Sequence, residues 1–252
     1  MMETQMLNPV MKEESAPIKI IMKKKKQKQK VLVLDSGTII NLAMNGLLYI
    51  FEELKKISEV KFILTQEVKN ETVDRPINIP RFELEALRIK SLIDNKIIES
   101  PSSLGIQEEE IRDLTKHLME TANHSVQLKG EWIKIVSDAE MSCLALSRIL
   151  TERGVENIIA IDERTTRILA EKPENLEKIM SGKMHANVKI ESGNFRNFSE
   201  FRFIRSTELV YVAYKKGLLK IKGSNALEAA LYATKYKGSS VSFDEINVLK
   251  KL

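Results

Sequence analysis

Short apolar runs alternate along the chain with longer segments in which apolar residues recur at helical spacing. Residues 31–34 (Val-Leu-Val-Leu) are continuously apolar, as expected for a strand buried on both faces, and so are residues 158–161. Further strands are predicted at residues 61–64, 96–99 and 201–204, and helices at residues 39–45, 47–57, 82–93, 107–126, 163–170, 207–216 and 226–236. This alternation predicts a three-layer α/β/α fold with a central, mostly parallel sheet.

Local signals mark the ends of two more helices. Ser137 and Glu140 have the spacing of a capping box at a helix start, and Gly154 stands in the usual position for stopping that helix. Ser242 and Glu245 have the same capping-box spacing. We therefore expect a helix between residues 137 and 154 and a short last helix after Ser242.

The domain organisation is predicted from shifts in composition. No internal repeat and no linker is visible after Lys30, which favours a single domain over residues 31–252. Residues 171–200 are polar and contain Pro173, Gly182 and Gly193, so we interpret them as an insertion. Residues 1–30 are expected to form a disordered basic leader.

The basic character of the chain comes from that leader. The whole chain has 40 basic and 35 acidic residues, and residues 1–30 hold eight lysines and three acids, which leaves 32 of each sign from Val31 onward. A pI of about 9.1 therefore does not describe the domain. The leader is either simply solvated or adds sequence-independent affinity for phosphate.

Cysteine and histidine usage excludes some classes of site. Cys143 is the single cysteine, and the three histidines do not have zinc-ligand spacing, so no internal disulfide and no cysteine-rich zinc site is expected. No apolar run approaches the roughly 18 residues of a membrane span, and no secretory signal core is visible. We expect a cytoplasmic protein with no membrane partner.

Acidic residues stand where the predicted strands end or a helix begins. Asp35 and Asp162 directly follow the two buried runs, Asp138 follows Ser137, and Glu67 follows the strand at residues 61–64. The carboxyl ends of parallel strands lie along one sheet edge, where ligands bind, so these acids are predicted to meet. Glu71 is the alternative to Glu67, because a shift of one helical turn would exchange them.

Such a group of carboxylates suits hard divalent cations, magnesium or manganese. A bound ion could activate water and neutralise charge on a phosphodiester, which fits a sequence without a Ser/His/Asp signature, a P-loop or a GxGxxG loop. Each acid also has a structural interpretation: Asp35 and Asp162 as helix N-caps, Asp138 in a first helical turn and Glu140 in its capping box.

Four segments together resemble the successive motifs of PIN-domain ribonucleases, in the same order along the chain. They are Val31-Leu-Val-Leu-Asp35-Ser-Gly-Thr38, Leu64-Thr-Gln-Glu67, Ser137-Asp-Ala-Glu140 and Ile159-Ala-Ile-Asp162-Glu163. Residues 238–246 are similar to the tail of stand-alone archaeal members. The resemblance implies a divalent-metal-dependent endoribonuclease, and the length favours RNA processing over a small toxin.

The resemblance also implies roles for individual residues. The positions that match the catalytic and metal-binding acids are Asp35, Glu67, Asp138 and Asp162, and the supporting positions are Ser36, Thr38, Glu140 and Glu163. Arg164 and Arg167 are three apart on a predicted helix, so they either contact phosphate or belong to a solvated face. Trp132 is interpreted as a core residue.

Two other functions are considered. A catalytically silent PIN-like module would bind RNA or protein without cutting, and a homodimer or a protein partner is compatible with it. Asp35-Ser-Gly-Thr38 also resembles the DxDGT motif of haloacid-dehalogenase phosphatases, but Gly37 replaces the second aspartate, which removes the required general acid.

Overall fold

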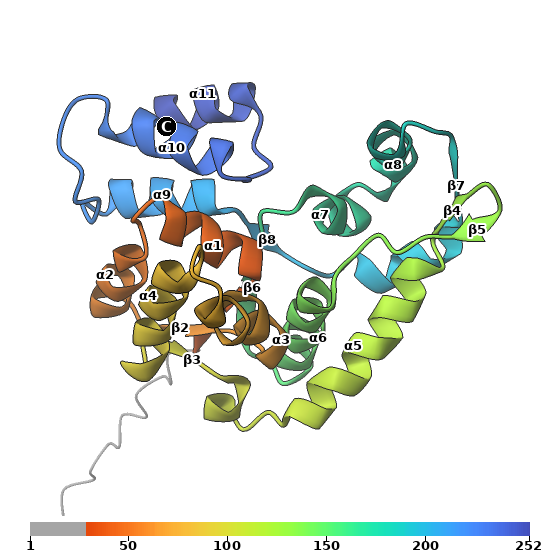
Figure 1. The fold of residues 1–252 in the computed structure, drawn as a ribbon, viewed down its shortest axis with the longest axis horizontal. Coiled ribbons are helices and arrows are strands. Elements are labelled where there is room, and N and C mark those ends of the chain that lie inside the picture. Colours follow the sequence, from red (N-terminus) through yellow and green to blue (C-terminus); the bar gives the residue numbers. More distant parts are fainter. Residues whose placement is uncertain (1–28) are drawn as a thin grey trace, which may run out of the picture.

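The computed structural model describes residues 29–252, which build an α/β fold around a five-stranded sheet (Figure 1). All neighbouring strands in this sheet are parallel. Their order across the sheet is β3 (Ile98–Glu99), β2 (Val60–Ile63), β1 (Lys30–Leu34), β6 (Glu156–Ala160) and β8 (Phe203–Ile204). The two predicted apolar runs form most of the central strands β1 and β6, where burial on both faces is greatest.

Helices flank this sheet in two groups, which confirms the predicted three-layer fold. α6 contacts β1 and β6 and is backed by the long α5, whereas α1 contacts α4 and α9, and α2 contacts β2 and α9. The helices are α1 (Ser36–Met44), α2 (Tyr49–Ile57), α3 (Gln66–Lys69), α4 (Glu83–Asp94), α5 (Glu108–Asn123), α6 (Asp138–Glu152), α7 (Arg164–Glu171), α8 (Leu176–Met184), α9 (Ser206–Lys215), α10 (Ala226–Tyr236) and α11 (Phe243–Lys251).

Short helical turns complete the described elements. A π-helical turn, η1 (Asn70–Asp74), directly continues α3. The 3-10 turns are η2 (Pro76–Asn78), η3 (Pro101–Leu104), η4 (Pro173–Asn175) and η5 (Ser192–Phe198). Both predicted capping boxes are present, at Ser137 with Glu140 and at Ser242 with Glu245.

The strand order reverses between β1 and β6. The chain moves outward from β1 to β2 and β3 and then returns to pair β6 on the other side of β1. In open α/β sheets, ligands bind at the carboxyl ends of the strands next to such a reversal. The backbone N–H of Asp35 donates to the carbonyl of Ala160 at 3.0 Å, so the β1–β6 pairing continues to the first residue beyond β1.

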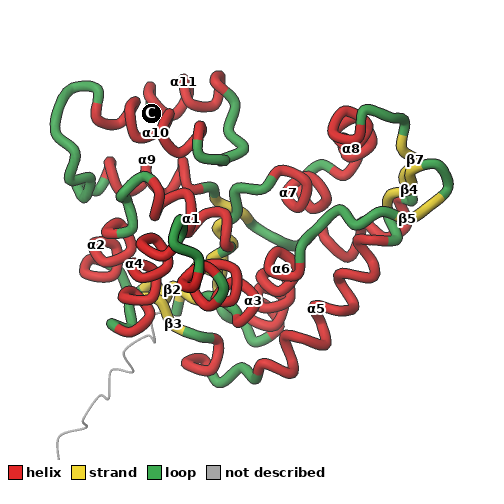
Figure 2. Tube along the Cα trace, in the orientation of Figure 1, coloured by secondary structure: helices red, strands yellow, loops and turns green. Residues whose placement is uncertain are grey.

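The polar segment at residues 171–200 is more ordered than its composition predicts. It forms α8, β7 (Val188–Ile190) and η5, and β7 pairs with β4 (Val126–Leu128) in a second, antiparallel sheet that also contains β5 (Glu131–Trp132). Figure 2 shows this small sheet at the right edge, away from the central strands. Because β4 joins it, the helix predicted to reach residue 126 ends at Asn123. Trp132 was wrongly predicted as core, since it is 43% exposed.

Residues 1–28 of the predicted leader, residues 1–30, lie outside the described residues. Lys30, the last residue of the predicted leader, belongs to β1. Among residues 29–252, no helix has both the length and the apolar character needed to cross a membrane.

Candidate functional site

Asp35 directly follows β1 at the carboxyl edge of the sheet, beside the end of β6. Its side chain caps α1, with Oδ2 accepting from the backbone N–H of Gly37 at 3.0 Å, and the residue is only 2% exposed. A Cβ atom at Gly37 would lie 3.2 Å from that oxygen, so glycine permits the close approach. Asp35 Oδ1 is buried and has no hydrogen-bond partner among residues 29–252. One carboxylate oxygen is therefore left for a ligand.

Glu71 and Glu140 lie near Asp35, and Glu163 lies near Glu140. We name these four residues the carboxylate cluster: Asp35, Glu71, Glu140 and Glu163. Ser36 Oγ donates to Glu71 Oε2 at 2.7 Å, which joins the start of α1 to η1. Thr166 links the other two glutamates, because its hydroxyl donates to Glu140 Oε2 and its backbone N–H to Glu163 Oε2, each at 2.8 Å.

The cluster is short of positive charge. Burial raises the pKa of Asp35 to about 8, and the charges of Glu140 and Glu71 add to that rise. Burial also raises the pKa of Glu140, with the charges of Glu163 and Glu71 contributing. Among residues 29–252, the single ion pair to any of the four carboxylates joins Lys183 to Glu163 at 3.6 Å. A bound cation would relieve this repulsion.

Asp162 lies beside the cluster but has both carboxylate oxygens occupied. Oδ2 accepts from Asn41 Nδ2 at 3.0 Å, and Oδ1 accepts from the backbone N–H of Ser206 at 2.9 Å. The Asn41 amide also donates to the carbonyl of Thr234 at 2.8 Å. Asp162 therefore ties α1, α9 and α10 to the end of β6. The sequence signal for Asn41 was a polar residue within an apolar helix, and it was missed.

The structure does not place Asp138 with Asp35. The Asp138 side chain is 68% exposed and pairs with Lys134 at 3.2 Å, whereas Glu140 points to the cluster. Residues two apart on an α-helix point about 200° apart, so only one of this pair can face inward. Glu140, predicted as a supporting residue, occupies the position that was expected for Asp138.

The alternative between Glu67 and Glu71 is decided by the π turn. Glu71 lies within η1 and accepts the bond from Ser36, whereas Glu67 lies in α3 and lines a separate pocket of about 270 Å³ with Asp138 and Arg112. The structure therefore brings Glu71 into the cluster and leaves Glu67 facing α5.

Buried polar atoms without a hydrogen-bond partner coincide with predicted site residues. Among residues 29–252 these atoms are Asp35 Oδ1, Thr38 Oγ1, Glu67 Oε2, Arg167 Nε and Ser206 Oγ. The first four belong to residues singled out in the sequence, and the fifth belongs to the residue whose N–H binds Asp162. Buried unpaired groups are rare in proteins, and a functional ligand is one physical explanation.

The cluster is compatible with a metal site that uses few protein ligands, but not with one enclosed by three or more side chains. Within residues 29–252, no three Asp, Glu, His or Cys side chains converge closely enough to enclose an ion. Magnesium commonly takes only one or two carboxylates and completes its octahedron with water and phosphate. The free oxygen of Asp35, together with Glu71 or Glu140, is compatible with that smaller ligand set.

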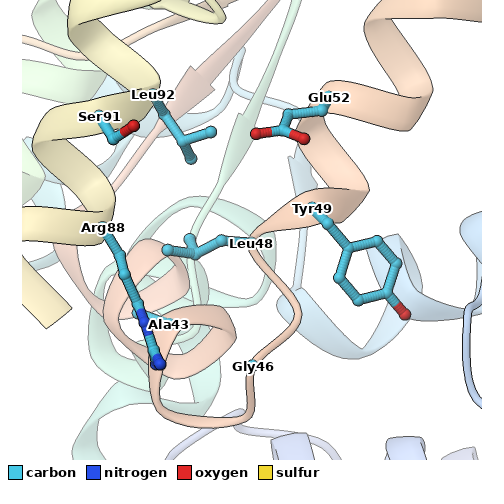
Figure 3. Close-up of a pocket in the computed structure, with 8 residues that line it drawn as sticks. All are labelled: Ala43, Gly46, Leu48, Tyr49, Glu52, Arg88, Ser91 and Leu92. Atoms are coloured by element: carbon cyan, nitrogen blue, oxygen red, sulfur yellow. The ribbon is translucent and has the colours of Figure 1, made fainter. Parts of the chain in front are cut away.

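A different pocket, of about 350 Å³, lies between the α1–α2 turn and α4. Figure 3 shows Leu48 and Leu92 on its apolar side, with the charged groups of Glu52 and Arg88 at its edges. It contains none of the predicted acids, so the carboxylate cluster is the better candidate for chemistry.

Comparison with known proteins adds no family to this description. No protein-family model matches the chain, and neither a curated protein nor a solved structure matches it. The resemblance to PIN-domain ribonucleases stays a prediction from the motifs.

Proposed function

We propose that this protein is a divalent-metal-dependent endoribonuclease that hydrolyses RNA phosphodiester bonds, with magnesium or manganese as its cofactor. The observation that carries the proposal is the Asp35 carboxyl. It is buried, has one oxygen without a partner and has a pKa raised to about 8 by burial and by Glu140 and Glu71. A buried carboxyl group without a cationic partner lowers the stability of the fold, and a bound cation would offset this loss of stability.

The residues of the site have separate roles in this proposal. Asp35, with Glu71 or Glu140, would hold the ion. A bound divalent cation supplies activation of a water molecule and neutralises charge that develops on the phosphodiester. Asp162 is a positioning residue, since its hydrogen bonds to Asn41 and Ser206 hold α1 and α9 in place beside Asp35. No nucleophilic side chain is required.

The alternative function is a catalytically silent PIN-like module that binds RNA or protein. The observation that favours it is that no three acidic, histidine or cysteine side chains among residues 29–252 converge on one point. The two functions differ in a simple way: the nuclease needs metal to act, whereas the silent module binds its partner in the presence of a chelator.

The experiment is an RNA cleavage assay with the purified full-length chain. End-labelled single-stranded and structured RNAs are incubated with manganese, magnesium or EDTA, and cleavage is expected only with metal. Asp35→Asn and Glu140→Gln are each expected to slow cleavage by about 100-fold or more. Asp138→Asn is the matched control, and its rate should stay within about twofold of wild type because Asp138 is exposed.

Two results would overturn the proposal. One is cleavage by Asp35→Asn at the wild-type rate, which would point to a contaminating nuclease or a different site. The other is the absence of cleavage with either metal together with RNA binding that survives EDTA, which would establish the silent module.

A further inference from the structure

A groove of about 870 Å³ is lined by residues of α7, of α8 and of the C-terminal segment that joins α10 to α11. Figure 1 shows where these elements lie. Six of its lining residues are basic and two are acidic: Arg164, Arg167, Lys172, Lys178, Arg205 and Lys235, against Glu171 and Glu245. The chain from residue 31 has equal numbers of basic and acidic residues. The groove therefore concentrates positive charge on a formally neutral domain.

Both acids of the groove are already neutralised. Arg167 donates to the two carboxylate oxygens of Glu171 at 3.1 Å each, and Arg205 pairs with Glu245 at 2.9 Å. Of the remaining cations, Lys235 donates to the carbonyl of Val241 and lies over the Phe243 ring. Within residues 29–252, the exposed side chains of Arg164, Lys172 and Lys178 have no carboxylate partner.

The groove lies next to Glu163 of the carboxylate cluster, although none of the four carboxylates lines it. Arg164 directly follows Glu163 in the chain, and Gly182 on the groove wall precedes Lys183, which pairs with Glu163. On the opposite wall, the backbone N–H of Ser240 donates to the carbonyl of Asp162 at 3.2 Å. An anionic chain lying in the groove would thus pass close to Glu163 and to the end of β6.

Resting on the proposed nuclease function, we propose that this groove binds the phosphate backbone of a single-stranded RNA segment leading into the carboxylate cluster. Lysine and arginine side chains supply sequence-independent affinity for phosphates. The volume lies in the range of small-ligand pockets, so the groove can hold a few nucleotides but cannot enclose a double helix.

The test measures RNA binding under conditions in which cleavage is blocked. Fluorescence anisotropy of a labelled oligouridine of about 12 nucleotides is recorded with the full-length chain in EDTA, between about 50 and 200 mM salt. The groove variant combines Arg164→Ala, Lys172→Ala and Lys178→Ala. It should weaken binding by about tenfold and reduce the slope of log K against log salt by about 2, since each phosphate contact on a single strand contributes about 0.7.

The matched control removes the same charge elsewhere. Arg88→Ala, Lys216→Ala and Lys222→Ala change three exposed cations outside the groove, and they should leave the affinity within about twofold of wild type. Thermal melting checks that both triple variants fold. A single Lys178→Glu variant, at an exposed position, repeats the test if the triple groove variant melts early.

Equal affinity and equal salt slope in the groove and control variants would overturn the proposal, because binding would then come from the leader or another surface. An equal loss of affinity for a duplex of the same length would overturn the assignment to single strands. The cleavage assay is read separately. If the groove variant binds RNA more weakly but the wild type cleaves no RNA, only the nuclease proposal fails. If the wild type cleaves RNA but the groove variant binds RNA as tightly as the control variant, only the groove proposal fails.

Discussion

The hydroxyl of Ser36 donates a hydrogen bond of 2.7 Å to the carboxylate of Glu71, a residue 35 positions later in the chain. The bond joins the first residue of α1, next to Asp35, to the π turn that follows α3. The bond brings Glu71, which comes after β2 in the chain, close to Asp35, which comes after β1. Single π turns are uncommon and recur at functional sites. This contact determines which glutamate completes the candidate site.

Metal binding is expected to distinguish Glu71 from Glu67. Glu71→Gln should weaken manganese binding by about 10- to 100-fold, because Glu71 contributes charge at Asp35. Glu67→Gln, four residues earlier, is the matched control, and its manganese affinity should change by less than about threefold. Isothermal titration calorimetry with manganese alone measures both. A larger effect at Glu67 would contradict the placement of Glu71 in the cluster.

Substitutions at the two buried aspartates should change stability in opposite directions when metal is chelated. The folded pKa of Asp35 is raised to about 8 from 3.8, so the stability it provides is present below pH 3.8 and is lost as the pH rises toward 8. Asp35→Asn should therefore stabilise the fold by about 1–2 kcal/mol near pH 8 and give no gain near pH 4.

Asp162→Asn should instead destabilise the fold, because an amide nitrogen would face the donor of Asn41 or Ser206. The expected loss is about 1–3 kcal/mol. Urea unfolding at both pH values measures the two variants. If both variants move stability in the same direction, the different environments of the two carboxylates are described incorrectly.

Removing the Asn41 side chain should destabilise the packing of α1 against α10 and Asp162. Asn41→Ala leaves an oxygen of Asp162 and the carbonyl of Thr234 buried without this donor, which should cost about 2–3 kcal/mol. Asn95→Ala is the matched control, because Asn95 is exposed and its amide donates to the exposed Ser91 Oγ; a change below about 1 kcal/mol is expected there. Equal losses in urea unfolding would show that the Asn41 bonds contribute nothing specific.

Acid stability should depend on the link between α9 and α11. Burial acts to raise the pKa of Glu245, but hydrogen bonding and the charge of Arg205 outweigh it and lower the pKa to about 2 from 4.5. The stabilisation is therefore present above pH 4.5 and is lost as the pH falls toward 2.

Glu245→Gln removes the charge and keeps the capping box with Ser242. Since the Glu245 side chain is 48% exposed, solvent screening limits the expected loss at neutral pH to about 1 kcal/mol. Wild type and variant should converge near pH 2. A constant difference across the pH range, in urea unfolding, would contradict an ionic origin.

Local sequence signals were sufficient for much of the fold. The helix predicted at residues 226–236 is α10 with the same bounds, and both capping boxes form as expected, because these features depend on residues within one or two turns. Residues 171–200 depended on distant partners. Strand β7 in this segment forms by pairing with β4, about 60 residues earlier in the chain. The composition of the segment does not indicate that pairing.

The candidate site, too, was predicted only in part from the sequence. From the sequence, a buried apolar run ending in Asp35 and another ending in Asp162 already implied two acids at one edge of a parallel sheet, because strand direction and side-chain burial follow from the pattern. The choice of Glu71 over Glu67, and of Glu140 over Asp138, came only with tertiary structure. Both choices depend on the rotation of a helix about its axis. A π turn and the packing of α6 against β1 and β6 set that rotation, and neighbouring positions in the sequence are compatible with either result.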